Sequence, residues 1–208
     1  MGPFSYYSRD RNNEQSQNCI INNKKTVTLM TQEINLAFIN SASQEDFTQL
    51  LAEIYEHSSW IPNQAWLQRP FDSIESLHQT MLKIVEDATL EQQLALLRAH
   101  PQLAGKEAKS GELTDSSTEE QSSANLNALS REELDEITAL NKQYMDAHGF
   151  PFIIAVKNHN KAGIFNEFKR RISLATNDEL HQAIWQVGLI AGFRLSALFP
   201  EYDNTTGN

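Results

Sequence analysis

Apolar residues recur at helical spacing through almost the whole chain after residue 31, and this pattern constrains the fold more than any other feature. Leu77, Met81, Ile84 and Val85 would share one face of a helix, and similar stripes precede and follow them. The apolar run FPFIIAV at 150–156 leaves room for one doubtful strand at most. The sequence therefore predicts an all-α fold, a compact single-domain helical bundle of about seven to eight helices.

Polar residues that can cap a helix set the expected boundaries of the first helices. Ser43 precedes a helix predicted at about 43–57, with an acidic residue in its first turn. Ser73 begins the next helix, and Thr89 with Gln92 matches a capping box. We expect the helix after Thr89 to end at a His-Pro pair, because proline disfavours the α conformation of the residue before it.

A second group of capping residues delimits the C-terminal helices. Ser130 and Glu133 match a capping box, and Gly149 is placed to end that helix in the left-handed conformation. Asn177 is expected to open the last helix. The two helices predicted after residue 156 cover approximately residues 161–174 and 178–198.

The first thirty residues differ in composition from the rest of the chain. They are rich in Asn, Ser and Gln and show no sustained period, so they carry too little apolar surface to offset the entropy lost on ordering. They also lack the basic start and the continuous apolar stretch of a secretory signal. The sequence predicts a disordered tail over residues 1–30 and one helical domain over residues 31–208.

The charge and the cysteine content limit the classes of partner and location. A net charge of -10 argues against general binding to nucleic acid or to an anionic membrane surface, which requires clustered Lys and Arg. No apolar run approaches the roughly 20 residues that cross a bilayer. The single cysteine, Cys19, cannot form an intramolecular disulfide, so we expect a reducing, cytoplasmic location.

His100 is the first candidate for a catalytic residue. It precedes Pro101 at the end of a predicted helix, so its side chain is free to leave the helix face. A helix C-terminus also favours the imidazolium, which suits an acid at neutral pH. A histidine that only ends the helix and interacts with its dipole has the same pattern, and the position does not decide between these interpretations.

Ser117 and Glu120 form the second candidate. Their Ser-x-x-Glu spacing before helical residues is that of a capping box, which is the favoured interpretation on spacing alone. This helix start follows a Gly-containing loop that returns the chain toward His100, and a helix N-terminus presents donors to an anion. The pair could therefore also form part of a ligand pocket, with the His-Pro break as its opposite wall.

Arg194 is the residue that helical spacing selects most sharply. It completes the apolar stripe of Val187, Ala191 and Leu198, so its stem points with the core face of the last helix. It either snorkels to the surface or pairs with a buried carboxylate such as Glu120. The alternative is a bidentate clamp for a substrate carboxylate.

Motifs for metal, phosphate and serine chemistry do not occur in the sequence. The histidines form no His-x-x-x-His pair, and no arrangement of Asp or Glu has a metal-binding spacing. A P-loop, a dinucleotide glycine fingerprint and a Gly-x-Ser-x-Gly elbow are also missing. We therefore predict no metal site. The sequence also has none of the motifs that usually indicate phosphate binding, nicotinamide binding or serine-hydrolase activity.

Three motifs in a fixed order carry a resemblance to a known family. They are HPQLAG at 100–105, STEEQSSANL at 117–126 and GFPFIIAV at 149–156, followed by an Arg-Leu pair near the end of the last helix. Together they resemble the 2-oxo-4-hydroxy-4-carboxy-5-ureidoimidazoline (OHCU) decarboxylases. The likeness covers approximately residues 33–199, and the motifs are specific as a set although each is weak alone.

The resemblance implies an all-α enzyme, usually a homodimer, that needs no cofactor and acts on a small-molecule substrate. The implied reaction is the decarboxylation of OHCU to (S)-allantoin, the third step of urate degradation. Loss of the C4 carboxylate leaves electron density that the adjacent imine can delocalise. An acid must then deliver a proton to one face of the ring.

The resemblance also assigns roles to residues of this sequence. His100 would be the catalytic acid, Glu120 would orient the C4 hydroxyl or the His, and Arg194 would bind polar groups of the substrate. The backbone amides of 152–156 would hold the ring oxygens. The substrate contacts that it implies are Pro101, Ser117, Glu120, Gln121, Phe152, Ile153, Ile154, Ala155, Val156 and Arg194.

Two positions depart from the usual pattern of the family. Asn125 stands where a glycine is frequent, and Gln102 where an aspartate is more frequent. Asn tolerates the left-handed conformation that a glycine would adopt, and Gln102 weakens only an ancillary contact. Neither departure touches the proposed acid, carboxylate or arginine.

Two other classes of function remain open at the level of sequence. One is a different lyase or hydrolase that acts on a related ureido compound. The other is a catalytically silent helical interaction module that keeps the scaffold, because a fold does not fix a function. The product formed from the urate oxidation intermediates distinguishes the three.

Overall fold

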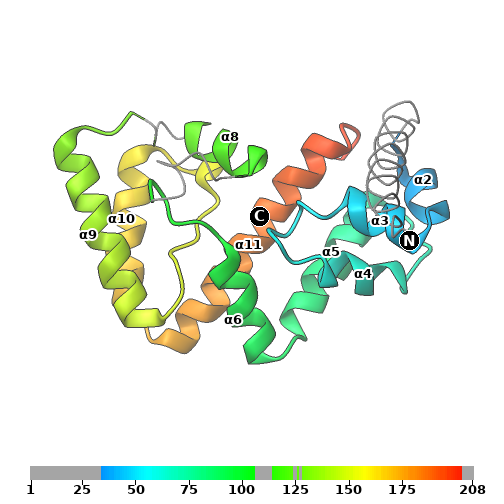
Figure 1. Cartoon of the computed structure of the whole chain (residues 1–208), viewed down its shortest axis with the longest axis horizontal. Helices are drawn as coiled ribbons and strands as arrows, with labels where there is room; N and C mark the ends of the chain where they lie inside the picture. The colour runs from blue at the N-terminus through cyan, green and yellow to red at the C-terminus, as the bar shows by residue number, and fades with distance from the viewer. Residues whose placement is uncertain (1–33, 106–113, 124–125, 127, 203–208) are drawn as a thin grey trace, which may run out of the picture.

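The computed structural model describes residues 34–105, 114–123, 126 and 128–202, and every regular element in these ranges is helical (Figure 1). The elements are α2 (Leu36–Ser41), α3 (Gln44–Leu50), α4 (Trp60–Trp66), α5 (Ile74–Glu86), α6 (Leu90–Ala99), α8 (Asp115–Ser123), α9 (Arg131–His148), η1 (Val156–Asn158), α10 (Lys161–Ile172) and α11 (Thr176–Leu198). The predicted all-α class is confirmed. The predicted tail, residues 1–30, lies outside the described residues. None of the described helices is both long and apolar enough to cross a membrane.

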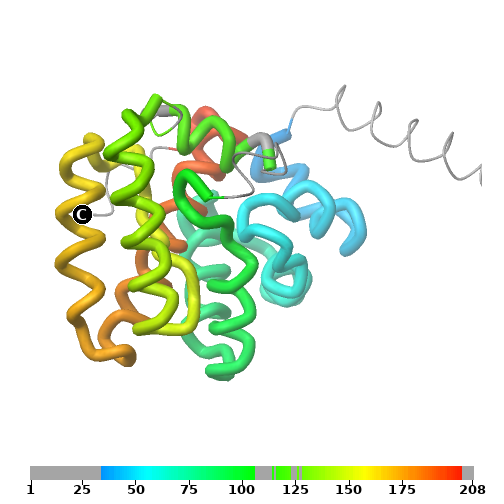
Figure 2. The backbone as a smooth tube through the Cα atoms, turned by 60° about the vertical axis from the view of Figure 1, so that its left-hand side comes forward, coloured from blue at the N-terminus to red at the C-terminus, as the bar shows by residue number. Residues whose placement is uncertain are grey.

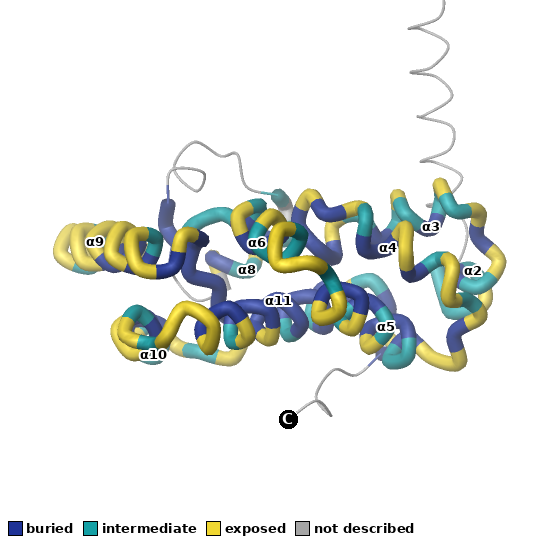
Figure 3. The backbone as a smooth tube through the Cα atoms, turned by 90° about the horizontal axis from the view of Figure 1, so that it is seen from below, coloured by how far each residue is buried: buried dark blue, intermediate teal, exposed yellow. Residues whose placement is uncertain are grey.

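Helix α11 forms the centre of the bundle, and the other long helices pack around it. It contacts α5, α6 and α9, and most of its length is buried (Figure 3). Helices α9 and α10 lie side by side on one side of the molecule, whereas α3 and α4 lie on the other (Figure 2). Buried charged and polar groups need partners, so three residues buried on α11 call for an explanation: Glu179, Gln186 and Arg194.

Most of the predicted helix ends are confirmed. Ser43, Ser73, Thr89 and Ser130 each accept a hydrogen bond from the amide three residues further on, and the last three complete capping boxes. Gly149 ends α9 with φ of 77°, in the left-handed conformation that glycine adopts most easily. These ends depend on contacts within one turn, which the sequence encodes locally.

The helix predicted at 43–57 ends earlier than expected. Helix α3 stops at Leu50, and the following seven residues form successive turns. The Glu53 carbonyl accepts a hydrogen bond from Arg194 Nη1 at 2.9 Å instead of one from a helical amide. One face of a helix cannot bury three consecutive side chains, and the turns do so for Ile54, Tyr55 and Glu56.

The start of the last helix also differs from the prediction. Helix α11 begins at Thr176, and the Ala175 carbonyl accepts the first helical bond from the Glu179 amide at 3.0 Å. Asn177 lies inside the first turn and is not the cap. The expected capping residue was wrong because backbone bonding alone starts this helix, with no side-chain cap.

Helices α5 and α11 approach each other closely at Gly188. A Cβ atom on Gly188 would lie 3.0 Å from Leu82 Cδ1, closer than packed side chains normally come. The Gly188 carbonyl also lies 2.9 Å from His78 Nε2, which must donate to it. The glycine therefore sets how closely α11 packs on α5.

Candidate active site

A small cavity of about 40 Å³ lies where the end of α6, helix α8, the segment before η1 and helix α11 meet. Its lining includes all but one of the residues that the sequence selected, together with Leu103 and Ile190. The one selected residue that does not line it is Ala155. The selected residues that line it are His100, Pro101, Ser117, Glu120, Gln121, Phe152, Ile153, Ile154, Val156 and Arg194.

His100 caps the C-terminus of α6 with extended backbone angles, φ of -75° and ψ of 137°. Its Nδ1 lies 2.9 Å from the Leu96 carbonyl, to which it must donate a proton, so the neutral ring carries its lone pair on Nε2. Burial lowers the pKa of His100, against the opposing effects of the Leu96 carbonyl and Glu56. A lowered pKa favours the neutral ring at neutral pH, which argues against the imidazolium that a helix C-terminus alone would favour.

Helix α8 carries Ser117 and Glu120, but not as a capping box. The helix begins at Asp115, and the Thr114 Oγ1 accepts a hydrogen bond from the Ser117 amide at 3.2 Å. Thr114 therefore caps the helix, and the capping-box interpretation of Ser117 and Glu120 is wrong. The Ser117 hydroxyl donates to Glu56 Oε1 at 2.9 Å, and the Glu120 carboxylate accepts hydrogen bonds from α11.

Arg194 uses all five of its N–H donors. Two of them, on Nε and Nη2, form a bidentate pair with Glu120 at 2.9 and 3.0 Å. Nη1 donates to Glu56 Oε2 at 2.7 Å and to the Glu53 carbonyl at 2.9 Å, and Nη2 contacts the Ser117 hydroxyl at 3.3 Å. The buried ion pair that helical spacing allowed is therefore present, and it includes the carboxylate of Glu120 that the sequence suggested.

Glu56 is the residue of this cluster that sequence reasoning missed. Its side chain is 2% exposed, and it contacts both Arg194 and Ser117. Burial raises the pKa of the Glu56 carboxyl, but the charge and hydrogen bond of Arg194, with smaller effects of His100 and Ser117, outweigh it and hold the pKa below its usual value. The available clue was that a buried guanidinium with five donors needs more acceptors than Glu120 alone provides.

Gln121 joins the loop after His100 to helix α8. Its Oε1 accepts a hydrogen bond from the Ala104 amide at 2.9 Å. Ala104 has φ of 49°, which is uncommon for a residue with a side chain, so this bond holds an unusual turn in place. Its amide nitrogen makes no hydrogen bond to the described part of the chain, and Gln121 lines the cavity.

The segment at 152–156 forms one wall of the cavity and is partly occupied from behind. The Ala155 amide donates to Gln186 Oε1 at 2.7 Å, so it cannot bind a ring oxygen of a substrate as expected. The Ile153 carbonyl accepts from Arg171 Nη1 at 2.8 Å. Substrate contact by the other backbone groups of this segment stays a prediction.

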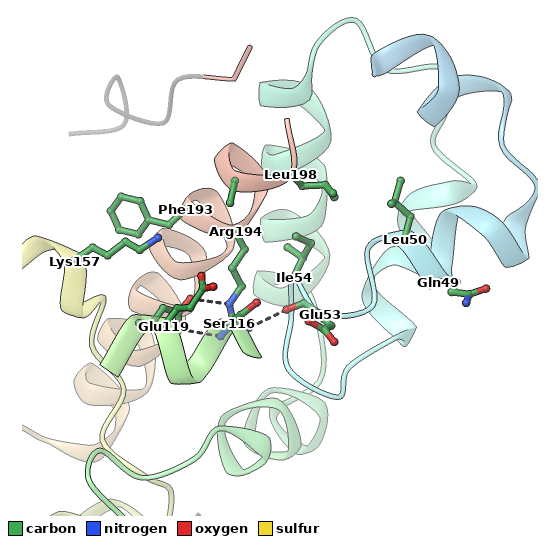
Figure 4. A pocket seen from close by; sticks show the side chains of 12 residues that line it. Gln49, Leu50, Glu53, Ile54, Ser116, Glu119, Lys157, Phe193, Arg194 and Leu198 are labelled. Carbon is green, nitrogen blue, oxygen red and sulfur yellow. Dashed lines mark hydrogen bonds and ion pairs between the residues drawn. The ribbon is translucent and has the colours of Figure 1, made fainter. Parts of the chain in front are cut away.

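A second cavity of about 390 Å³ lies on the outer side of the arginine cluster and shares Glu120 and Arg194 with the small one. Figure 4 shows Arg194 reaching from α11 toward α8, with Lys157 and Phe193 on one side and Glu53 on the other. The pair of Arg194 and Glu120 therefore borders both spaces. No group of three or more His, Cys, Asp or Glu side chains in the described ranges is arranged to hold a metal ion.

Comparisons with known proteins agree with this geometry. The sequence pattern of the OHCU decarboxylase family matches residues 40–196. The chain is 40% identical over 167 residues to a 2-oxo-4-hydroxy-4-carboxy-5-ureidoimidazoline decarboxylase of Haloferax volcanii, covering 80% of this chain and 97% of the relative. It is 38% identical over 167 residues to a protein of the same name from Halalkalicoccus jeotgali, covering 80% and 93%. A crystal structure of an (S)-allantoin synthase superposes with a TM-score of 0.62 at 27% identity, over 79% of this chain and 54% of that one. The chain belongs to the OHCU decarboxylase family.

Proposed function

We propose that this chain decarboxylates OHCU to (S)-allantoin in urate degradation, with no metal ion or organic cofactor. One observation carries the proposal beyond family membership. Residues from four segments distant in the sequence meet around one cavity, and they supply a histidine, a carboxylate, an arginine and a stretch of backbone that lines it. These are the groups needed to bind an anion with several ring oxygens and to move protons on it.

The neutral state of His100 gives the reaction a definite order. Breaking the bond to the C4 carboxylate sends its electron pair into the C4–C5 bond, and the imine pair moves to the ring nitrogen, which takes a proton from water. His100 Nε2 then accepts the C4 hydroxyl proton as the C4 carbonyl forms. The imidazolium delivers this proton to one face of C5. His100 thus acts first as a base and then as the acid that the resemblance implies.

Glu120 is the partner of Arg194 that we expect the substrate to displace. Its side chain is 13% exposed and borders both cavities, whereas the Glu56 side chain is 2% exposed. If Glu120 turned away, Arg194 would keep Glu56 as its counterion and gain two donors for a polar group of the substrate. In its new position the Glu120 carboxylate would accept a hydrogen bond from the C4 hydroxyl.

The size of the inner cavity supports this exchange. Its volume of about 40 Å³ is far below the roughly 300 Å³ and more that is typical of ligand pockets. Movement of Glu120 would join it to the outer cavity of about 390 Å³, because both spaces share this residue. Gln121 lines the inner cavity, and its amide nitrogen would then donate to a substrate oxygen.

We also propose that the protein works as a cytoplasmic homodimer. The cytoplasmic location is supported by the single cysteine, which provides no intramolecular disulfide for an oxidising compartment. The dimer follows from the resemblance to the family. Light scattering coupled to size exclusion measures the mass in solution, and a mass of one chain, 23.6 kDa, would reject the dimer.

The proposed reaction is tested by circular dichroism, starting from urate, urate oxidase and hydroxyisourate hydrolase. Adding this chain should speed the appearance of optically active allantoin. Loss of the intermediate to a different product would instead indicate another lyase or hydrolase. An unchanged time course would indicate a helical module without catalytic activity.

A further inference from the structure

The cavity wall at 152–156 is held from behind by two buried polar side chains that do not line the cavity. Arg171 on α10 donates to the Ile153 carbonyl at 2.8 Å, and Gln186 on α11 accepts from the Ala155 amide at 2.7 Å. We propose that Arg171 and Gln186 are positioning residues that aim the backbone of Ile154 at the substrate. This inference rests on the proposed function.

The two peptide bonds on either side of Ile154 decide where its backbone groups point. Across a trans peptide bond the C=O of one residue and the N–H of the next point in opposite directions. Ile153 and Ala155 both direct polar groups toward the scaffold. The N–H and C=O of Ile154 therefore face the opposite side, and Ile154 lines the cavity.

The backbone of Ile154 is available to a ligand. It is buried, and neither its amide nor its carbonyl makes a hydrogen bond to any residue that the structure describes. A buried backbone group without a partner is costly, so it normally meets a side chain, water or a ligand. One donor and one acceptor at adjacent atoms match the amide-like edge of a ureido group or of the substrate ring.

The anchor behind this wall is itself rigid. Arg171 and Glu179 are fully buried, with Arg171 Nε 2.9 and 3.1 Å from the two Glu179 oxygens. The Tyr144 hydroxyl donates to the same carboxylate. The guanidinium also lies 4.5 Å from the centre of the Phe152 ring, which stacks on Phe168. A group fixed on this many sides can hold a carbonyl in one place.

Gln186 links the wall to the arginine cluster. It lies on α11 two turns before Arg194, and Ile190 between them lines the cavity. The same helix therefore places both the Ile154 backbone and the guanidinium. A shift of the wall changes its distance from the groups that bind the other end of the substrate.

Replacing Gln186 by Met tests the proposal, because Met keeps the length and apolar stem but removes the acceptor for the Ala155 amide. A loosened wall should lower kcat/KM by about 10-fold to 100-fold, as misplacement by a residue remote from the chemistry does. The loss should appear mainly as a higher KM, while kcat, calculated per folded molecule, should change little. Gln186→Glu, which restores an acceptor oxygen at the same reach, should recover most of it.

His78→Leu is the matched control for stability. His78 is also a buried polar residue that bonds α11, through the Gly188 carbonyl, but it does not line the cavity. The His78→Leu substitution should lower the melting temperature but leave kcat and KM at their wild-type values. If Gln186→Met does not fold, Gln186→Asn carries the same expectation, because its side chain is too short to reach the Ala155 amide.

The outcomes separate this proposal from the proposed function. A wild type that forms no allantoin overturns both. An active wild type with an unchanged kcat/KM in Gln186→Met, or with an equal loss in Gln186→Glu, overturns only the positioning role. An equal loss of kcat/KM in His78→Leu also overturns it, because destabilisation alone would then explain the effect.

Discussion

Two buried arginine clusters in this chain differ in how many carboxylates they hold. Arg171 contacts one carboxylate, that of Glu179, and both side chains are fully buried. Arg194 contacts two, those of Glu56 and Glu120, at the edge of a cavity. Counted over the described side chains, the first cluster is neutral and the second carries one net negative charge.

This difference separates a structural cluster from one that can exchange a partner. Removing the only counterion of a buried cation leaves an uncompensated charge, which is strongly destabilising. A cluster with a second carboxylate keeps a neutral pair when one partner leaves. Arg194 can therefore meet a substrate, whereas Arg171 is suited to hold a backbone in place.

Replacing His100 by Asn should give the largest loss of activity. His100 lines the cavity beside the Arg194 cluster, where we place the chemistry. Turnover should fall by about 10² to 10⁴-fold, the usual contribution of a positioned acid or base. The melting temperature should change little, since Asn can still donate to the Leu96 carbonyl. The rate of allantoin formation measures turnover, and thermal melts measure stability. If the His100→Asn variant keeps the turnover of the wild type, another residue must donate the proton.

Glu179→Gln should be the most damaging change for stability. It removes the one carboxylate that contacts Arg171 among the described residues, at a cost of about 3 to 5 kcal/mol for a broken buried pair. Chemical denaturation measures the free energy of unfolding. If the variant unfolds at the same denaturant concentration as wild type, the two clusters do not differ as their charges suggest.

Glu120→Gln should show the reverse pattern. Arg194 keeps Glu56 as its counterion, so the loss of stability should be clearly smaller than the about 3 to 5 kcal/mol expected for Glu179→Gln. Activity should nevertheless fall by at least about 10-fold, because the group that receives the C4 hydroxyl loses its charge. Full activity in this variant would mean that the carboxylate only pairs with Arg194.

Acid pH should reduce both activity and stability at the cavity. Burial lowers the pKa of His100 below its usual 6.5, so the unfolded chain takes up this proton first as the pH falls. The stability linked to His100 is therefore complete above pH 6.5 and is lost progressively below it. Burial lowers the pKa of His78 in the same direction.

Activity separates the two histidines. Both affect the melting temperature between neutral and mildly acid pH, whereas only His100 should affect the acid limb of kcat/KM. Measuring both quantities for the wild type and for His78→Leu checks this assignment. An acid limb above pH 6.5 would show that the ring is not held neutral.

The smallest effect is expected for the segment outside both clusters. We propose that residues 31–208 form the complete folding unit, so deleting residues 1–29 should leave the melting temperature and turnover nearly unchanged. Differential scanning calorimetry and the allantoin assay on the truncated chain test this. A drop of several degrees would show that the segment packs against the helical domain.

The sequence predicted features that depend on neighbours in the chain. The caps at Ser73 and Ser130 and the turn at Gly149 rest on residues within one helical turn, and the inward direction of Arg194 follows from helical period. Except for Leu103 and Ile190, the resemblance supplied the remaining residues of the cavity. Their convergence could be expected from it, but the distances could not.

Long-range partners could not be predicted in the same way. Glu56 meets Arg194 across 138 residues of sequence, and Gln186 meets Ala155 across 31. No periodic pattern in the sequence indicates either contact, because each depends on how the helices pack. The protonation of His100 was missed for a related reason, since its burial comes from tertiary contacts and not from the helix that it ends.

The placement of Gln186, Ile190 and Arg194 along one side of α11 limits how the gene can change. Each residue added to a helix rotates the remainder of that helix by about 100° and advances it by about 1.5 Å. An insertion or deletion between Gln186 and Arg194 would therefore turn the guanidinium out of the cavity while leaving the wall in place. Substitutions can accumulate on the exposed side of this helix, but its length between these two residues cannot vary.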